Sequence, residues 1–362
     1  MKWLTWKADE IKSIQILRAI AALSVVNVHA TGAKDYNLLY FGSFGVDIFF
    51  VISGFVIAFV ITKDTSHFML KRFFRICPMY YLATLVAAVS LFVFPQLINN
   101  EVSLSVVGFI KSLLFIPSAE NGGKPVLGVG WTLQFEMFFY LVMYISLLLL
   151  RNKKYAPYLC IVLILLYLGV AQVIRPNNYA LKYFNNDLML EFVYGVILFK
   201  CYEYVKTKNL NINSVAKIIM SAIGAISCYG FMIFINSNQL YVTYRCVYFG
   251  LPSLLFVISL LALEKNMKDT NWTRVFVKIG EASYIMYLLH YHIVLFFSRV
   301  IFNKLIGPNS IFILELFKLI IAFIAVIVIS VILHEFVDNP IQKRLKKLLK
   351  RKKTVETLAV PL

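Results

Sequence analysis

Long apolar segments recur along almost the whole chain and are separated by short polar stretches. Each is long enough for a helix to cross a bilayer, which takes about 20 mainly apolar residues. The pattern predicts an all-α polytopic membrane protein with a bundle of ten transmembrane helices. The predicted spans lie near residues 13–31, 44–62, 77–95, 131–150, 156–174, 188–205, 214–234, 243–263, 281–302 and 312–334. Composition agrees, because 60% of the residues are hydrophobic and 15% are charged, which is more apolar than a soluble domain.

Positive charge alternates from one loop to the next along this pattern. Most of the 36 lysines and arginines lie in every second loop and in the terminal segments, including KRLKKLLKRKK after the last span. Because such loops stay in the cytoplasm, both termini are predicted to lie inside the cell. The predicted organisation is a cytoplasmic segment (1–12), a ten-helix transmembrane domain (13–340) and a basic cytoplasmic tail (341–362). Membrane orientation accounts for the net charge of +18, so no nucleic-acid partner is expected.

Three further features refine this picture. Segment 102–117 is apolar but short and contains Gly108 and Lys111, so it is predicted to be an interfacial or re-entrant helix on the outer side. The stretch HEFVDNPIQKR is predicted to close the last span, with Pro340 ending the helix. The five cysteines are widely scattered, so neither a disulfide framework nor a metal site is expected.

The first span carries two ionisable residues, Arg18 and His29. Their separation of eleven residues puts them on one helix face, about 16 Å apart along the axis. The structural alternative is that Arg18 extends to the inner headgroups while His29 caps the outer end. The alignment favours a shared groove along this face.

Two acidic residues lie at a depth similar to that of His29. Asp47 begins the second span, where it could also serve as an anion favoured by the helix dipole. Gly54 lies on the Asp47 face and permits the close approach of another backbone. Glu136 lies in the outer third of the fourth span, on one face with Thr132 and Tyr140. A carboxylate at that depth must face the bundle interior or a wet cavity.

At the inner side, Arg72 and Arg75 lie one turn apart in the loop before the third span. Two guanidinium groups at this spacing can clamp a phosphate. The alternative is that they are ordinary positive charges of a cytoplasmic loop and bind anionic lipid. In the ninth span, Tyr287 and His290 share one face, whereas His292 is predicted to point elsewhere. Cationic groups at the inner mouth and ionisable groups near the outer side suggest an anionic cytosolic donor that delivers a group to an outer acceptor.

Six motifs occur in order and resemble those of the membrane acyltransferase-3 family, whose members O-acylate bacterial surface polysaccharides. They are ILRAIAALSVVNVH, FGVDIFFVISGF, RFFR, WTLQFEMFFY, SYIMYLLH and a terminal acidic turn that ends in Pro340. The resemblance covers the chain from about Gln15 to Arg344. Leu289 and the turn Asp338-Asn339-Pro340 depart from the commoner residues of the family.

The resemblance implies an O-acetyltransferase of the bacterial inner membrane that uses cytosolic acyl-CoA, usually acetyl-CoA, and a glycan or lipid-linked sugar hydroxyl. Its donor-binding residues correspond to Arg18, Arg72 and Arg75, and no metal is implied. We expect His29 to act as general base or as acylated nucleophile, oriented by Asp47 or Glu136. The residues expected to bind the substrate are Trp131, Tyr140, Tyr287 and His290. The alternative function is a glycan transporter or flippase, but no inverted repeat is evident.

Overall fold

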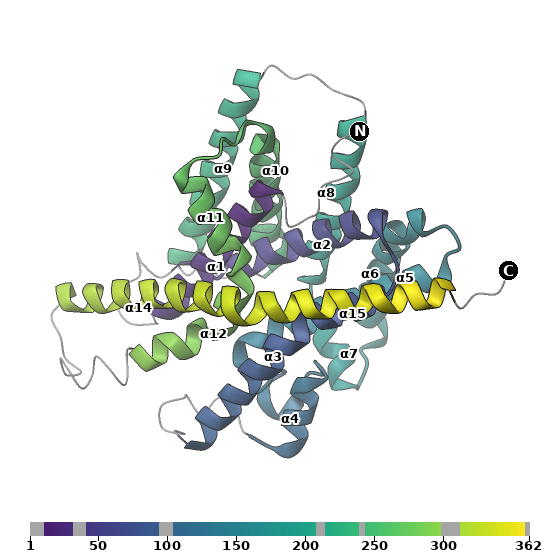
Figure 1. Cartoon of the computed structure of the whole chain (residues 1–362), viewed down its shortest axis with the longest axis horizontal. Coiled ribbons are helices and arrows are strands. Elements are labelled where there is room, and N and C mark those ends of the chain that lie inside the picture. The colour runs from purple at the N-terminus through teal and green to yellow at the C-terminus, as the bar shows by residue number, and fades with distance from the viewer. Residues whose placement is uncertain are drawn as a thin grey trace.

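Helices form all the regular structure of the described residues. The computed structural model describes residues 11–31, 41–93, 104–207, 214–238, 243–297 and 312–358 (Figure 1). Within these ranges there is no β-strand, which confirms the predicted all-α class. The helices are α1 (Lys12–Thr31), α2 (Gly45–Lys63), α3 (Phe68–Val93), α4 (Val106–Leu113), α5 (Trp131–Leu149), α6 (Ala156–Ile174), α7 (Tyr179–Phe184), α8 (Met189–Thr207), α9 (Ser214–Ser237), α10 (Leu251–Leu263), α11 (Asn271–Glu281), α12 (Ser283–Leu295), α14 (Phe312–Leu333) and α15 (Asn339–Leu358).

Eight helices of the described part are long and apolar enough to cross a membrane. These candidate spans comprise α1, α2, α3, α5, α6 and α9, together with the segments Cys246–Asn266 and Phe317–Leu349. They correspond to eight of the ten predicted spans, which confirms a polytopic membrane protein. The other two predicted spans contain α8, which carries several charges, and α12, beyond which residues 298–311 lie outside the described residues. The count of ten and the cytoplasmic position of both termini stay predictions.

The segment predicted not to span the membrane contains the short helix α4. Eight residues of α helix extend only about 12 Å, far less than the thickness of a bilayer. The helix is held against α3, because the Tyr80 hydroxyl donates to the carbonyl of Ser112 at 3.1 Å. The ring of Tyr80 also stacks on Phe115 with a centroid distance of 4.6 Å.

Helix α1 lies at the centre of the bundle and contacts α2, α10, α11, α12 and α14 (Figure 1). Its first backbone amides are capped from a distant part of the chain. The carboxylate of Glu264 accepts from the amide of Lys12 at 3.1 Å and from that of Ser13 at 2.7 Å. An anion at this position satisfies unpaired donors and complements the helix dipole. The cap therefore fixes the helix that carries Arg18 and His29.

Helices α2 and α8 approach each other closely through two glycines. A Cβ atom on Gly54 would lie 2.1 Å from the carbonyl oxygen of Phe192, and one on Gly195 would lie 2.1 Å from that of Val51. Only a residue without a side chain fits such an approach. The close backbone contact predicted at Gly54 is confirmed.

Replacing Gly54 with valine should destabilise the protein by about 3 kcal/mol or more, because the clash involves backbone that cannot move aside cheaply. The melting temperature in detergent, measured by size-exclusion chromatography after heating, provides the test. Gly169→Val in α6 is the matched control, since a Cβ there meets nothing within 4 Å. Equal melting temperatures for the two variants would contradict the predicted packing role.

The last two helices form one long rod, because a π-helical turn at His334–Asp338 joins α14 to α15 (Figure 1). The prediction that Pro340 ends the helix is wrong. The π-helical turn lies directly before Pro340, the second residue of α15, and changes the backbone hydrogen-bond pattern at the point where proline has no N–H to donate.

A side chain of α15 attaches this rod to α3. Pro78 lies inside α3 and has no N–H to donate, so the carbonyl of Phe74, four residues earlier, lacks its usual helical partner. The amide nitrogen of Gln342 donates to that carbonyl at 2.9 Å. The start of α15 is thereby held beside the segment of α3 that carries Arg72 and Arg75.

Candidate functional site

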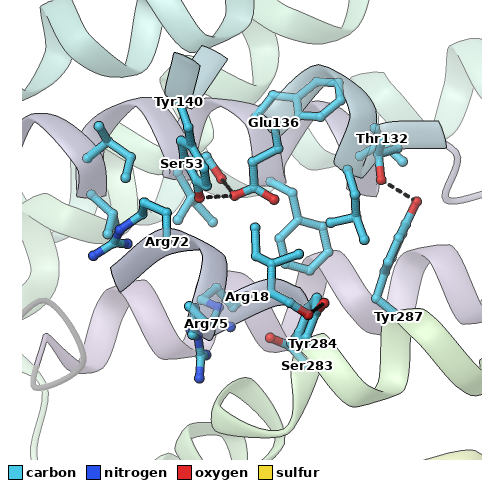
Figure 2. Close-up of a pocket in the computed structure, with 18 of the residues that line it drawn as sticks. Arg18, Ser53, Arg72, Arg75, Thr132, Glu136, Tyr140, Ser283, Tyr284 and Tyr287 are labelled. Atoms are coloured by element: carbon cyan, nitrogen blue, oxygen red, sulfur yellow. Dashed lines mark hydrogen bonds between the residues drawn. The ribbon is translucent and has the colours of Figure 1, made fainter. Parts of the chain in front are cut away.

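A cavity of about 150 Å³ lies among α1, α2, α3, α5 and α12, and we call it the arginine cavity. Its polar lining residues are Gln15, Arg18, Ser53, Arg72, Arg75, Thr132, Glu136, Tyr140, Ser283, Tyr284 and Tyr287. Figure 2 shows Arg72 and Arg75 toward one end, the Thr132–Tyr287 pair at the other and Glu136 between them. The three arginines predicted to bind the donor therefore line one cavity.

Arg72 lies in this cavity without an ion-pair partner among the described residues. Its guanidinium carbon lies 5.9 Å from the centroid of the Phe68 ring, and its buried Nε atom has no hydrogen-bond acceptor in the part of the chain that the structure describes. A buried donor left unpaired costs about 1–3 kcal/mol, and more when it is charged. An anion bound in the cavity would remove that cost. Arg72 lies in helix α3 and not in the loop expected before it.

Arg75 faces an acidic residue at the junction of α14 and α15. Its Nη1 atom lies 3.8 Å from Oδ2 of Asp338, which is fully buried. Asp338 is also 3.1 Å from Nδ1 of His334. The arrangement orients the Arg75 guanidinium while leaving about a third of its side chain exposed.

Glu136 lies in the arginine cavity, where two hydroxyl groups of the bundle donate to its Oε1 atom. One is the hydroxyl of Ser53 at 2.9 Å, and the other is that of Tyr140 (Figure 2). The described contacts of Glu136 do not include His29. Glu136 and Tyr140 thus lie with the groups predicted for the donor, whereas the sequence hypothesis placed Glu136 beside the His29 imidazole and gave Tyr140 to the substrate.

A second cavity, of about 380 Å³, lies beside the first, and we call it the histidine cavity. Its polar and aromatic lining residues are His29, Ser43, Lys124, Trp131, Arg245, Tyr287, Tyr291 and His292. The prediction that His292 points away from the site is therefore wrong. Because Trp131 and His29 line the same cavity, the structure brings together a predicted acceptor-binding residue and the predicted catalytic residue.

The imidazole rings of His29 and His290 are in direct contact. Nε2 of His290 lies 3.2 Å from Nδ1 of His29, and the ring centroids are 4.8 Å apart. The same Nδ1 atom of His29 lies 2.9 Å from the carbonyl oxygen of Val25. His290 is fully buried, whereas His29 is exposed to the cavity. Among the residues that the structure describes, the ionisable group in hydrogen-bond contact with His29 is thus a second histidine.

Asp47 is occupied by an ion pair that the sequence hypothesis missed. Both of its carboxylate oxygens accept from Arg245, at 2.8 Å from Nε and 2.7 Å from Nη2. Arg245 also donates to the carbonyl of Ser43 at 2.9 Å. Asp47 is fully buried, and the buried Glu191 of α8 interacts electrostatically with both members of the pair. The described contacts of Asp47 do not include His29.

Replacing Asp47 with asparagine should destabilise the protein by about 3–5 kcal/mol, because it leaves a largely buried guanidinium without its counter-ion. Thermal unfolding in detergent measures this loss. Asp64→Asn is the matched control: Asp64 makes a half-exposed ion pair with Lys71 at 2.7 Å, which is worth about 1 kcal/mol or less. Unchanged thermal stability in Asp47→Asn, combined with a 100-fold loss of transfer, would show instead that Asp47 is catalytic.

The two cavities share Val46 and Tyr287 in their linings. The Tyr287 hydroxyl accepts from Thr132 at 2.8 Å and donates to the carbonyl of Val129 at 2.8 Å (Figure 2). This side chain therefore stands between the arginines and His29. The two cavities therefore adjoin at Val46 and Tyr287.

The fold and its adjoining cavities define a polytopic membrane protein in which three arginines line one cavity and an accessible imidazole lines the other. The chain belongs to the acyltransferase-3 family, because the acyltransferase domain that defines the family matches residues 11–335. The resemblance inferred from the six motifs is thereby confirmed.

Two relatives narrow the class. The chain is 32% identical over 260 residues to the exopolysaccharide production protein ExoZ of Rhizobium meliloti. That alignment covers 69% of this chain and 75% of ExoZ. This chain is also 24% identical over 370 residues to the peptidoglycan O-acetyltransferase OatA of Listeria monocytogenes. That alignment covers 92% of this chain and 56% of OatA. The chain thus spans little more than half the length of OatA. No solved structure matches it. Family and relatives together make this chain an O-acyltransferase by class.

Proposed function

We propose that the protein transfers an acyl group, in the first instance acetyl, from cytosolic acyl-CoA to a hydroxyl of a glycan on the outer side of the bacterial inner membrane. The observation that carries this proposal is the adjacency of the two cavities. One presents Arg72, whose Nε atom is buried without a hydrogen-bond acceptor among the described residues, the other presents His29, and they share Tyr287.

The donor enters from the arginine side. Coenzyme A is polyanionic, and planar guanidinium groups bind phosphate oxygens in pairs. Arg72 and Arg75 hold the phosphates, and Arg18 lines the same cavity. Arg18 and His29 are separated by about 16 Å along α1, a distance comparable with an extended pantetheine arm. The thioester is thereby brought past Tyr287 to His29.

At His29 the ring removes the proton of the acceptor hydroxyl as the oxygen attacks the thioester carbonyl, a role typically worth about 10²–10⁴-fold. The carbon–sulfur bond then breaks, and the coenzyme A thiolate takes the proton from the imidazolium. The new ester remains on the glycan. A route through an acylated imidazole uses the same atoms in two steps and leaves a labelled enzyme intermediate.

The acceptor occupies the histidine cavity. Trp131 and Tyr291 offer aromatic faces on which a sugar ring packs, and Lys124 adds a hydrogen-bond donor. A glycan acceptor is supported by the two relatives, whose names refer to exopolysaccharide production and peptidoglycan O-acetylation.

Membranes that contain the protein, incubated with acetyl-labelled acetyl-CoA and an exopolysaccharide stripped of O-esters by mild alkali, test the proposal. Alkali-labile label should appear on the polysaccharide and should be absent with His29→Ala membranes. Movement of unmodified polysaccharide into the vesicles without transfer of label would support the flippase alternative instead.

A further inference from the structure

We propose that His290 is the positioning residue of this site: it holds a proton on Nδ1 of His29 and so leaves Nε2 of His29 as the base. The proposal rests on the function proposed above, and it gives the orienting role to a neutral imidazole in place of Asp47 or Glu136. The contact between the two rings, at 3.2 Å, is the observation from which it starts.

The surroundings of His290 determine where its proton lies. Its Nδ1 atom is 2.8 Å from the carbonyl oxygen of Tyr287 and 3.2 Å from that of Met286. Carbonyl oxygens only accept hydrogen bonds, so Nδ1 must carry a proton. A charged imidazolium is disfavoured where the ring is fully buried, because no carboxylate of the described residues contacts it. The ring is therefore neutral, and its Nε2 presents a lone pair toward His29.

The proton of His29 follows from the same reasoning. Its Nδ1 atom faces two acceptors, the carbonyl oxygen of Val25 at 2.9 Å and the Nε2 lone pair of His290 at 3.2 Å. Nδ1 must therefore be the protonated nitrogen, shared between these acceptors. The Nε2 atom of His29 then holds the free lone pair, and the ring is accessible from the histidine cavity.

This arrangement does the work that a carboxylate does in a hydrolase triad, where the third group fixes the tautomer of the base and stabilises the imidazolium that forms. Both candidate carboxylates have other partners: Arg245 binds Asp47, and Ser53 and Tyr140 bind Glu136. A neutral acceptor also avoids placing a further charge inside the membrane, which is costly.

Paired substitutions at His290 separate positioning from packing. His290→Leu removes the acceptor, and the turnover number should fall about 100-fold, by analogy with the loss of an orienting group in a triad, while the KM for acetyl-CoA stays within about twofold. His290→Gln supplies an amide oxygen that can accept from His29. Its turnover number should therefore be at least tenfold higher than that of His290→Leu. Equal turnover in the two variants would overturn the proposal.

Nitrogen NMR of the full-length protein in detergent, labelled at histidine, gives a readout that needs no substrate. His29→Gln and His290→Gln samples assign the signals, and the resting protein should show Nδ1 protonated on both rings. A proton on Nε2 of His29 would overturn the proposal while leaving the proposed function standing. Absence of any acetyl transfer by the unmodified protein would refute the function and leave the tautomer assignment to be judged by NMR alone.

Discussion

Replacing His29 with alanine should reduce acyl transfer by at least about 10²–10⁴-fold, the range contributed by a general base, while the protein stays folded and inserted. The reason is geometric: among the described residues, His29 is the histidine that both lines the cavity and contacts a second imidazole. Transfer of labelled acetyl to an acceptor polysaccharide measures the loss, and the melting temperature in detergent reports folding.

His67→Asn is the control for this experiment. His67 precedes α3 in a left-handed backbone conformation with φ of 50°, which asparagine tolerates better than most residues, so the variant should keep full activity. If His29→Ala transferred acetyl at the normal rate, the assignment of His29 would be wrong. Acid quenching during turnover separates the two routes, since only the nucleophilic route leaves label on the enzyme.

Changing Arg72 and Arg75 together to glutamine should raise the KM for acetyl-CoA by about 100-fold or more. A hydrogen bond to a charged group contributes about 1.5–3 kcal/mol, and each 1.4 kcal/mol is a factor of ten. Steady-state transfer at varied acetyl-CoA concentration measures the change. Lys71→Gln is the matched control, because Lys71 lies beside Arg72 but pairs with Asp64 and does not line the cavity.

A truncated donor identifies what the arginines recognise. Acetyl-pantetheine carries the same thioester but lacks the phosphates of coenzyme A, so the double variant and the unmodified protein should use it equally poorly. If the double variant lost activity with acetyl-pantetheine to the same degree as with acetyl-CoA, the arginines would act on folding or chemistry and not on the donor phosphates.

Much of the fold could be predicted because a membrane imposes one rule on every span. About 20 apolar residues must be helical to satisfy their own backbone in lipid, so apolar runs alone located eight helices. Helix ends obey weaker rules. Helix α3 begins at Phe68, nine residues before the predicted span, and α15 continues through Pro340, because ends depend on local capping and on contacts with other helices.

The candidate site was predictable only in part. Helical spacing put Arg18 and His29 on one face of α1, and the structure places each in one of the two adjoining cavities. Spacing within one helix carries no information about which other helix faces it. The Asp47–Arg245 pair joins residues 198 positions apart, and the His29–His290 contact joins residues 261 apart.

His292 shows how a correct local rule can mislead. Two residues along a helix turn it by about 200°, so His292 was expected to point away from the site that Tyr287 and His290 face. Instead Tyr287, Tyr291 and His292 all line the histidine cavity, while His290 is fully buried against His29. A sequence signal for this arrangement would need pairwise information between α1 and α12.

The central claim is that the donor and the acceptor reach His29 from opposite sides of the membrane. It is tested by proteoliposomes selected for a lumenal C-terminal tail, with labelled acetyl-CoA trapped inside and polysaccharide stripped of O-esters added outside. The account predicts that label reaches the external polysaccharide, and that acetyl-CoA supplied only outside yields none. Transfer only when donor and acceptor share one side would contradict it.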